Sequence, residues 1–483
     1  MKILFVASEV APFAKTGGLA DVTGSLPKEL KRMGHDVRII LPYYSTIAAG
    51  GFAESATGRS VEVRIGKQTE VGHLWQGMLD NIPVYFLDHE EFFRRKYLYG
   101  TPTGDYPDNA RRFAFFSRAV LKILPGWDFY PDVLHCHDWQ SALVPIVMKH
   151  EFARDPFFNT IAVLFTIHNL AYQGLFPPEF LDDMGLDHSY FSIDLLEYYG
   201  KINLLKGAIL SADLVNTVSE TYRGEILTPE QGCGLEGVLT VRGEDLSGIL
   251  NGLDYGEWDP ATDSTIFCNF SAADPVGKGL NKAQLQTLLG FPQEAGIPLI
   301  GMISRLSAQK GFDLVAELLP SLLKRNVQLV VLGDGEEEYV RLIKEAAGPK
   351  AGNISFHFGF DLTLARRIYA GCDMFLMPSR YEPCGLGQLI ALRYGAVPVV
   401  RKTGGLADTV FDPGDSAEPT GFTFTGYDSG ELRKTLMRAI KTWQDKKKWQ
   451  KIMQRGMSRD FSWQASAEKY VELYRLGITR KRS

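Results

Sequence analysis

Short apolar segments alternate with helix-like, amphipathic segments through most of this 483-residue chain. Apolar segments of this kind are typical of strands that are buried on both faces of a parallel sheet. Because parallel strands are joined by crossover connections, usually helices, the alternation predicts doubly wound α/β domains. The expected strands lie at 3–7, 35–41, 132–136, 160–167 and 213–218 in the first half of the chain, and at 298–303, 327–332, 353–357, 373–377 and 397–400 in the second.

Between the two series, residues 254–281 are rich in Asp, Pro, Gly, Ser and Asn and show little periodicity, so we expect a hinge and a loop there. This break predicts two Rossmann-like domains, 1–250 and 251–459, with a C-terminal helix within 460–483 that packs back on the first. The other expected elements are the strands of a β-rich insertion, at 61–65, 72–79 and 83–87, and helices at 19–33, 108–124, 139–150, 313–325, 336–346, 362–371, 387–394, 429–443 and 463–476.

The composition argues against several classes of protein. A net charge of −5 gives no global attraction to nucleic acid or to an anionic membrane, so neither is an expected partner. The five cysteines are scattered and form no CxxC pair, which is typical of a reduced protein without a disulfide framework. The N-terminal apolar run ends at Ser8, too early for a signal sequence, and no segment reaches the ~20 apolar residues that span a bilayer. We therefore expect a cytoplasmic protein.

One heptapeptide, KTGGLAD, occurs at 15–21 and again at 402–408. Both copies follow a predicted strand and precede a helical segment. Paired glycines in such a position let backbone N–H groups approach an anion at a helix N-terminus. An alternative interpretation is two unrelated turns that each start a helix. For the first copy, ligand binding is the stronger interpretation, because Lys15 adds a charge that a turn does not need.

Two loops in the second half follow predicted strands and carry groups suited to ligand binding. Residues 304–311 contain Arg305 and Lys310, which together can neutralise a diphosphate, Arg as a bidentate fork and Lys as a point charge. Residues 378–387 contain Glu382, which suits sugar hydroxyls or a developing oxocarbenium charge, ahead of a Cys-Gly-Leu-Gly turn with backbone N–H groups to offer. The alternatives are a solvated basic loop and a carboxylate placed at a helix N-terminus.

Polar residues also follow two predicted strands of the first half. His168 and Asn169 end one strand and can hydrogen-bond to sugar hydroxyls. Asp138 and Trp139 follow another and combine a carboxylate with an aromatic face, which suits a pyranose ring. Helix-capping roles for the polar residues, and a core position for the tryptophan, are the alternatives.

Two patterns resemble cofactor sites but lack the required context. His135 and His137 share one strand face, yet no third ligand has a recognisable spacing, so no metal is expected. Residues 232–237 match GxGxxG, but no strand immediately precedes them, so the βαβ context of dinucleotide binding is missing. We expect neither NAD nor any other cofactor, and interpret 232–237 as a glycine-rich loop.

Together these motifs resemble the bacterial and plant-type glycogen and starch synthases, nearly end to end. The resemblance is carried by residues 15–21, 137–139, 166–174, 216–219, 251–254, 304–306, 309–311 and 382–386. It implies a GT-B fold, in which two Rossmann-like domains face each other across a deep cleft. It also implies a glycosyltransferase that moves glucose from ADP-glucose to the non-reducing end of an α-1,4-glucan, glycogen or a malto-oligosaccharide, with retention of configuration, release of ADP and no metal.

The resemblance further implies roles for individual residues. The nucleotide sugar would bind mostly to the C-terminal domain and the glucan to the N-terminal domain. Arg305 and Lys310 would stabilise the departing diphosphate, with His168 near the reacting carbon. The expected catalytic residues are Glu382, His168, Arg305 and Lys310; the donor-binding residues are Lys15, Gly17, Gly18, Asn169, Asn251, Phe360, Cys384, Gly385, Leu386, Thr403 and Gly404; and the acceptor-binding residues are Asp21, Asp138 and Trp139.

The chain departs from the broader retaining GT-B pattern at Ile390, where many relatives carry a second glutamate that contacts the ribose, so ribose recognition is unassigned. Phe360 stands where an aromatic ring often stacks on the base. The closest rival interpretation is another retaining GT-B transferase that uses UDP-glucose or a small acceptor. A non-catalytic glucan-binding or nucleotide-sensing protein is a second rival. A phosphorylase is a third, although no segment resembles its pyridoxal-phosphate lysine site.

Overall fold

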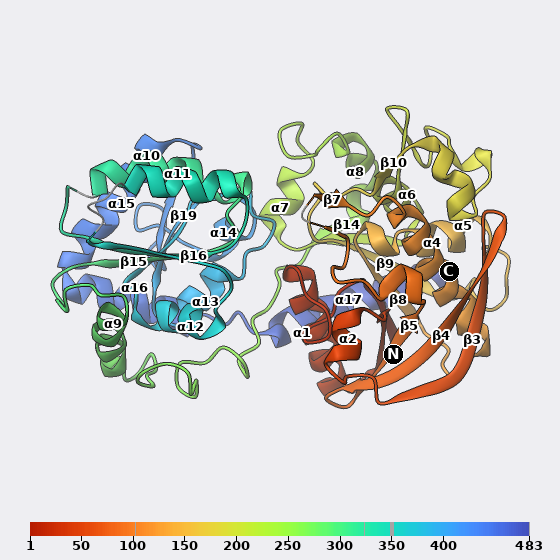
Figure 1. Ribbon diagram of the computed structural model, residues 1–483, viewed down its shortest axis with the longest axis horizontal. Helices are drawn as coiled ribbons and strands as arrows, with labels where there is room; N and C mark the ends of the chain where they lie inside the picture. The colour runs from red at the N-terminus through yellow and green to blue at the C-terminus, as the bar shows by residue number, and fades with distance from the viewer. Residues whose placement is uncertain (102, 323, 348–351, 483) are drawn as a thin grey trace. The chain divides into compact units, whose positions relative to one another are not determined.

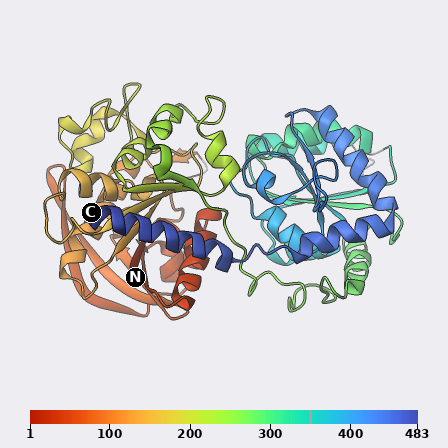
Figure 2. The same ribbon diagram turned by 180° about the vertical axis from the view of Figure 1, so that it is seen from behind.

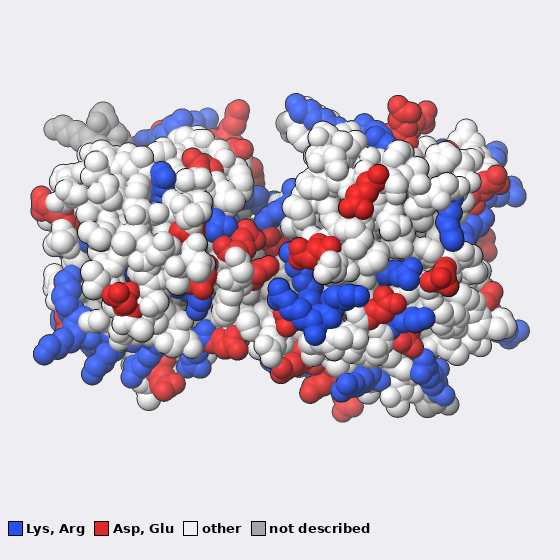
Figure 3. All heavy atoms as spheres, turned by 90° about the horizontal axis from the view of Figure 1, so that it is seen from below, with Lys and Arg blue, Asp and Glu red and all other residues white. Residues whose placement is uncertain are grey.

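The computed structural model describes residues 1–101, 103–322, 324–347 and 352–482. The chain divides into two compact units, which we call unit 1 (Met1–Gly252 with Trp463–Ser483) and unit 2 (Leu253–Ser462) (Figure 1). Among the described residues, no helix combines the length and the apolar character needed to cross a membrane. On the face drawn in Figure 3, acidic and basic side chains are interspersed over both units.

Unit 1 is built on a nine-stranded sheet with the order β14-β13-β9-β8-β1-β2-β5-β4-β3. Neighbouring strands pair in parallel from β14 to β5, and β4 and β3 extend one edge in the antiparallel sense. The strands are β1 Lys2–Val6, β2 Asp36–Pro42, β3 Ser55–Ile65, β4 Gln68–Leu79, β5 Ile82–Asp88, β8 Val133–His137, β9 Ala162–Ile167, β13 Leu214–Thr217 and β14 Leu246–Gly248.

The strands expected as an insertion are part of this sheet, and the first is longer than predicted. β3 begins at Ser55 and not at 61. The prediction missed its first residues because they are mostly exposed and the register shifts between Ala56 and Ser60. A strand segment with no buried face shows no apolar alternation from which it could be predicted. β14 was not predicted, because it is only three residues long.

The larger helices of unit 1 form two groups. α1 Gly18–Arg32 lies beside the C-terminal helix α17 Trp463–Arg482, which also contacts β8 and β9 (Figure 2). α4 Asn109–Ile123 packs against α5 Leu143–His150, which in turn packs against α6 Leu204–Ser211. Smaller elements are α2 Ser45–Ala49, α3 Glu90–Phe93, α7 Glu220–Glu225, α8 Glu236–Arg242, the hairpin β6 Gly100–Thr101 and β7 Gly104–Asp105, and a small sheet of β10 Leu175–Phe176, β11 Glu197–Tyr198 and β12 Lys201–Asn203.

Unit 2 contains a wholly parallel six-stranded sheet with the order β17-β16-β15-β18-β19-β20. The five strands expected from the sequence are confirmed, and β20 is an addition. The strands are β15 Leu299–Ile303, β16 Gln328–Gly333, β17 Ile354–Phe358, β18 Met374–Met377, β19 Val397–Arg401 and β20 Phe422–Phe424. The helices are α9 Val276–Leu288, α10 Phe312–Leu322, α11 Glu337–Ala347, α12 Leu362–Gly371, α13 Gly387–Arg393, α14 Gly404–Thr409, α15 Ser429–Gln444 and α16 Lys446–Ser458.

The expectation of a loop throughout 254–281 was wrong at its end, because α9 begins at Val276. The residues that α9 buries recur at helical spacing, but most of them are polar, including Lys278, Asn281 and Lys282. A search for an apolar stripe therefore misses this helix. Tertiary contacts, rather than an apolar face, decide its position.

Lys278 shows what those contacts are. Its ammonium group donates to the carbonyl oxygens of Tyr394 at 2.8 Å, Ala370 at 3.1 Å and Tyr369 at 3.4 Å. These carbonyls belong to the last turns of α12 and α13, where orphan acceptors and the helix dipole favour a cation. Burial lowers the pKa of Lys278 to about 8. The lysine thus joins three helices at one buried point.

We expect Lys278→Met to destabilise unit 2 by about 3 kcal/mol, because buried carbonyl groups lose their donor and each unsatisfied group costs about 1–3 kcal/mol. Denaturant unfolding followed by circular dichroism measures the change. Lys441→Met, on an exposed position of α15, is the matched control and should stay within about 0.5 kcal/mol of the parent. Equal stability of the two variants would contradict the capping role.

Candidate active site

In unit 1 the predicted residues Asp138 and His168 lie at the carboxyl ends of β8 and β9, which are adjacent in the sheet. Parallel strands place these ends at one edge, where α/β proteins bind ligands. Asp138 follows β8 and His168 follows β9, and the His168 N–H donates to Asp138 Oδ1 at 2.8 Å. The structure therefore brings together two residues that the sequence places thirty positions apart.

Asp138 is held in a strained conformation. Its φ of 52° and ψ of −179° fall in a region that only glycine adopts readily, at a cost of about 1–3 kcal/mol. Loss of solvation, reinforced by the nearby charge of Glu9, raises the pKa of Asp138 to about 7, although backbone N–H groups of His168 and Asn169 oppose the shift. Backbone strain and a shifted carboxyl pKa in one residue are typical of a functional site.

His168 is buried and its ring pairs with a second histidine. His168 Nε2 lies 3.0 Å from Nδ1 of His137. Burial lowers the pKa of His168 to about 3, so the ring is neutral at physiological pH. Asn169, the next residue, accepts the N–H of Ala171 through its side-chain oxygen. Its side chain shapes the turn that follows β9. The structure does not test the predicted contact of Asn169 with the nucleotide sugar.

Glu9 is a residue that the sequence analysis missed. This buried carboxylate accepts the backbone N–H groups of Thr16 at 2.5 Å and Gly17 at 3.2 Å, and the hydroxyls of Thr16 and Tyr99 at 2.7 Å. The N–H groups of Thr16 and Gly17, in the motif where we expected an anion to bind, thus point to an internal carboxylate. A glutamate three residues after a buried strand was the available signal, but it has no motif of its own.

The two identical heptapeptides have different surroundings. In the first, Lys15 pairs with Asp21 at 2.6 Å, whereas in the second Lys402 pairs with Asp415 at 3.4 Å. A Cβ atom added at Gly17 or Gly18 would meet nothing within 4 Å. A Cβ atom at Gly404, whose φ is +44°, would lie 1.9 Å from the carbonyl oxygen of Glu382. The first motif is open to a ligand, and the second is packed against the Glu382 loop.

Two further predicted residues of unit 1 are partly or wholly enclosed. Trp139 is half-buried, and its ring lies edge-on to Phe113 at 5.0 Å between ring centroids and tilted against Phe176 at 5.6 Å. Asn251 is buried, and its side-chain oxygen has no partner among the described residues. An unpaired buried oxygen costs free energy. The predicted contact of Asn251 with the nucleotide sugar would give this oxygen a hydrogen-bond partner.

In unit 2 the structure brings the half-buried Lys310 and the buried Glu382 into an ion pair. Lys310 Nζ lies 2.6 Å from Glu382 Oε2, which also accepts the Ser379 hydroxyl at 3.0 Å. The two loops leave the neighbouring strands β15 and β18. They are fastened by the Gln309 side chain, which donates to the Tyr381 carbonyl oxygen at 3.1 Å. The lysine predicted to bind a diphosphate and the glutamate predicted to bind sugar hydroxyls are therefore in direct contact.

Other predicted residues of unit 2 stand in varied surroundings. Arg305 is exposed, and its guanidinium pairs with none of the residues that the structure describes. Phe360 is 87% exposed, which leaves its ring face open for stacking. Cys384 is buried, and Gly385, with φ +77°, and Leu386 lead into α13. Ile390 is buried in the hydrophobic core of unit 2, so its position serves packing in this chain.

Neither cofactor pattern gains support from the structure. Among the described residues, no three His, Cys, Asp or Glu side chains are grouped as a metal site requires. Residues 232–237 follow α7 and run into the start of α8, which confirms that no strand immediately precedes them.

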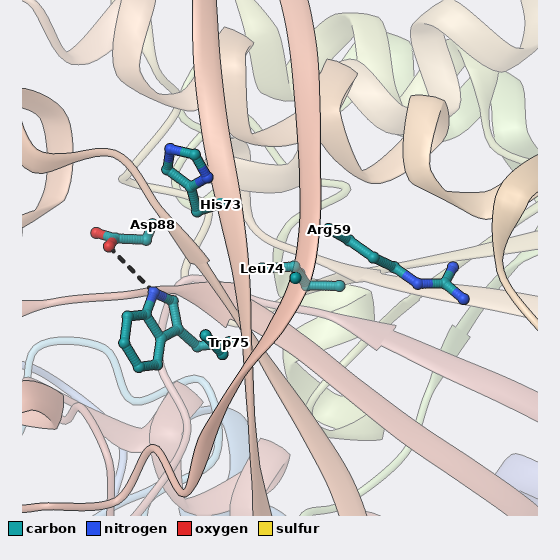
Figure 4. Close-up of a pocket in the computed structure, with 7 residues that line it drawn as sticks. Arg59, His73, Leu74, Trp75 and Asp88 are labelled. Atoms are coloured by element: carbon teal, nitrogen blue, oxygen red, sulfur yellow. Dashed lines mark hydrogen bonds between the residues drawn. The ribbon is translucent and has the colours of Figure 1, made fainter.

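A cavity of about 290 Å³ lies beside the β3–β4 hairpin, away from the predicted residues (Figure 4). Figure 4 shows Trp75 and Asp88 on one side of the strands and Arg59 on the other. Trp75 Nε1 donates to Asp88 Oδ2 at 3.2 Å, and Arg94 occupies both oxygens of the same carboxylate. These polar groups satisfy one another, and the cavity presents no converging set of ligand-binding atoms.

The two heptapeptides offer a matched test of their surroundings. Gly17→Ala should change stability by less than about 0.5 kcal/mol, because its backbone is extended and the space beside it is open. Gly404→Ala should cost about 3 kcal/mol or more, because a Cβ atom at positive φ would overlap a backbone oxygen. Thermal unfolding of both variants measures the difference, and similar values for the two would contradict it.

The raised pKa of the Asp138 carboxyl predicts that the stability of the protein depends on pH. Its folded pKa, about 7, lies above its unfolded value of 3.8, so its stabilising contribution is complete below about pH 4 and is lost as the pH rises to about 7. Asp138→Asn removes this contribution. Between pH 5 and pH 8 the unfolding free energy of the parent should therefore fall relative to the variant, by about 3 kcal/mol. A pH-independent difference between the two proteins would show that the carboxyl is not shifted.

Comparison with known proteins is consistent with this arrangement. A family described as "Starch synthase catalytic domain" matches residues 2–241, and one described as "Glycosyl transferases group 1" matches residues 292–455. The chain is 60% identical to a glycogen synthase of Geotalea uraniireducens and 58% identical to one of Geotalea daltonii, in each case over all of both chains.

A solved structure is similar over almost the whole chain. The catalytic domain of starch synthase IV from Arabidopsis thaliana, bound to ADP and acarbose, is 37% identical with a TM-score of 0.91, and the match covers 99% of each chain. The two α/β units, each built on a mainly or wholly parallel sheet, are those of the GT-B class. The chain therefore belongs to the glycogen and starch synthase family of glycosyltransferases.

Proposed function

We propose that this protein transfers glucose from ADP-glucose to the non-reducing end of an α-1,4-glucan, with retention of configuration and release of ADP. The observation that carries the proposal is the Lys310–Glu382 ion pair at the carboxyl ends of β15 and β18. It supplies a cation for a diphosphate and a carboxylate for sugar hydroxyls at one place. The relatives are named glycogen synthases, and the similar plant enzyme binds ADP and acarbose.

In the proposed reaction the bond between the anomeric carbon and the diphosphate oxygen breaks, and negative charge collects on the departing diphosphate. Arg305 and Lys310 stabilise that charge, Arg305 through its exposed guanidinium and Lys310 by exchanging Glu382 for phosphate oxygens. Glu382, once released, accepts hydrogen bonds from glucose hydroxyls. The proton of the attacking acceptor hydroxyl passes to the diphosphate, and the new glycosidic bond forms on the same face of the sugar.

Unit 2 is the proposed donor side and unit 1 the proposed acceptor side. On unit 2, Phe360 would stack on the base, and the turn Cys384, Gly385 and Leu386 would bind the sugar, supported by Thr403 and Gly404. On unit 1, Asp21, Asp138 and Trp139 would contact the glucan, whereas Lys15, Gly17, Gly18, Asn169 and Asn251 would reach the donor. The open space beside Gly17 and Gly18 supports this, since a ligand can approach the backbone there. The proposed location is cytoplasmic, supported by the few, scattered cysteines of the sequence.

The direct test offers purified protein ADP-glucose or UDP-glucose with glycogen, and measures nucleoside diphosphate release and glucan extension. We expect release of ADP with matching growth of the glucan. Faster turnover of UDP-glucose would overturn the assignment of the donor. Binding of glycogen and nucleotide without turnover would favour a non-catalytic protein.

The two cationic side chains proposed to bind the diphosphate, Arg305 and Lys310, lead to a quantitative prediction. Charge develops on the diphosphate mainly in the transition state, so Arg305→Ala and Lys310→Ala should each lower kcat about 10- to 100-fold with a smaller change in KM. Arg305→Lys should recover only part of the loss, because a point charge does not replace a bidentate fork. Steady-state kinetics with varied ADP-glucose at saturating glycogen measures these effects.

Arg433→Ala, on an exposed position of α15, is the surface control and should leave kcat unchanged. Thermal unfolding is measured in parallel, because removal of Lys310 leaves Glu382 buried without its cation. Parent-like kcat in either Arg305→Ala or Lys310→Ala would remove that residue from the mechanism.

A further inference from the structure

Three histidines and two tyrosines form a buried layer beneath the carboxyl ends of β8 and β9. His135 and His137 on β8 are fully buried, with ring centroids 4.1 Å apart, and His168 follows β9. Tyr470 and Tyr474 reach the layer from α17. Each polar atom in such a layer needs a partner, so the pattern of donors and acceptors can be worked out.

The proton of His135 is assigned by its neighbours. The Asn216 side-chain nitrogen donates to the Thr217 carbonyl oxygen and to Tyr470, so its oxygen faces Thr166. The Thr166 hydroxyl donates its only proton to that oxygen at 2.6 Å and must accept from His135 Nε2, also at 2.6 Å. His135 therefore carries its proton on Nε2.

The second nitrogen of His135 is also occupied. Its Nδ1 has no proton and accepts the Tyr474 hydroxyl at 2.8 Å. With both ring nitrogens engaged, His135 offers neither a donor nor an acceptor to the tilted ring of His137 beside it.

His137 has one engaged nitrogen and one without a partner. Its Nδ1 lies 3.0 Å from His168 Nε2, whereas its Nε2 is buried and has no partner among the described residues. A proton on Nε2 would be an orphaned buried donor, which folded proteins avoid more strictly than an unused acceptor. The proton of His137 therefore belongs on Nδ1.

We propose that His137 is a positioning residue, whose Nδ1–H donates to Nε2 of His168 and so fixes His168 as the donor of a single N–H, from Nδ1, toward a hydroxyl oxygen of the bound glucose. This rests on the proposed function for the contact between His168 and the sugar. With its Nε2 occupied, His168 cannot accept a proton from the acceptor hydroxyl. Burial, which lowers the pKa of both rings, keeps them in this neutral arrangement.

The tautomer is measured directly, without activity. Protein labelled with ¹⁵N-histidine is examined by two-dimensional NMR, and the His168 signals are assigned by their loss in His168→Asn. We expect a protonated Nδ1 and an unprotonated Nε2 in the parent, and loss of this preference in His137→Leu. A protonated Nε2 in the parent, or an unchanged tautomer in His137→Leu, would overturn the proposal. This result does not depend on whether ADP-glucose is the donor.

Kinetics with ADP-glucose and glycogen provides the second arm. His137→Leu removes the donor and should lower kcat about tenfold or more, whereas His137→Asn keeps a donor near Nδ1 and should stay within about threefold of the parent. Tyr474→Phe removes a buried hydrogen bond of the same layer but leaves the His137–His168 contact intact. It should lower the melting temperature without changing kcat or the His168 tautomer. Equal kcat in His137→Leu and His137→Asn, or a changed tautomer with parent-like kcat, would overturn the positioning role.

Discussion

Parallel pairing of the central strands decides where the candidate site residues of this protein lie. In unit 1, β1, β8 and β9 are adjacent and end at one edge, so Glu9, Asp138 and His168 follow them into one small region. In unit 2, β15 and β18 do the same for Lys310 and Glu382. Crossover helices separate these strands along the chain, and the hydrogen-bonded ladder brings their ends together.

Burial of charge at these strand ends is compensated before any substrate binds. Glu382 has Lys310 and a serine hydroxyl, and Glu9 has two backbone N–H groups and two hydroxyls. Asp138, with fewer donors, responds instead through a raised pKa. Lys310 is therefore paired with the carboxylate of Glu382, and Lys15 with that of Asp21. Removal of either partner of the Lys310–Glu382 pair would leave the other charge uncompensated.

Most of the fold could be predicted from the sequence, because strands buried on both faces are continuous apolar runs. The exceptions have physical reasons. The start of β3 has little buried face, and α9 buries lysines and an asparagine instead of apolar side chains. The candidate site was predicted where a residue stands in a motif, as Glu382 and His168 do. Glu9 shows the limit, since what marks it is a set of buried hydrogen-bond partners and not a motif.

The two KTGGLAD segments separate what a local sequence determines from what the tertiary structure decides. Both start a helix, α1 at Gly18 and α14 at Gly404, because glycine permits the turn and the following residues favour a helix. Their partners differ completely: Lys15 meets Asp21 while Lys402 meets Asp415, and Gly17 faces open space while Gly404 touches the Glu382 loop. Backbone preference acts over a few residues, so the residues of the heptapeptide determine it. The contacts that give one copy a ligand-accessible face and the other a packing role come from strands and loops distant in the chain, and only the folded sheet brings them there.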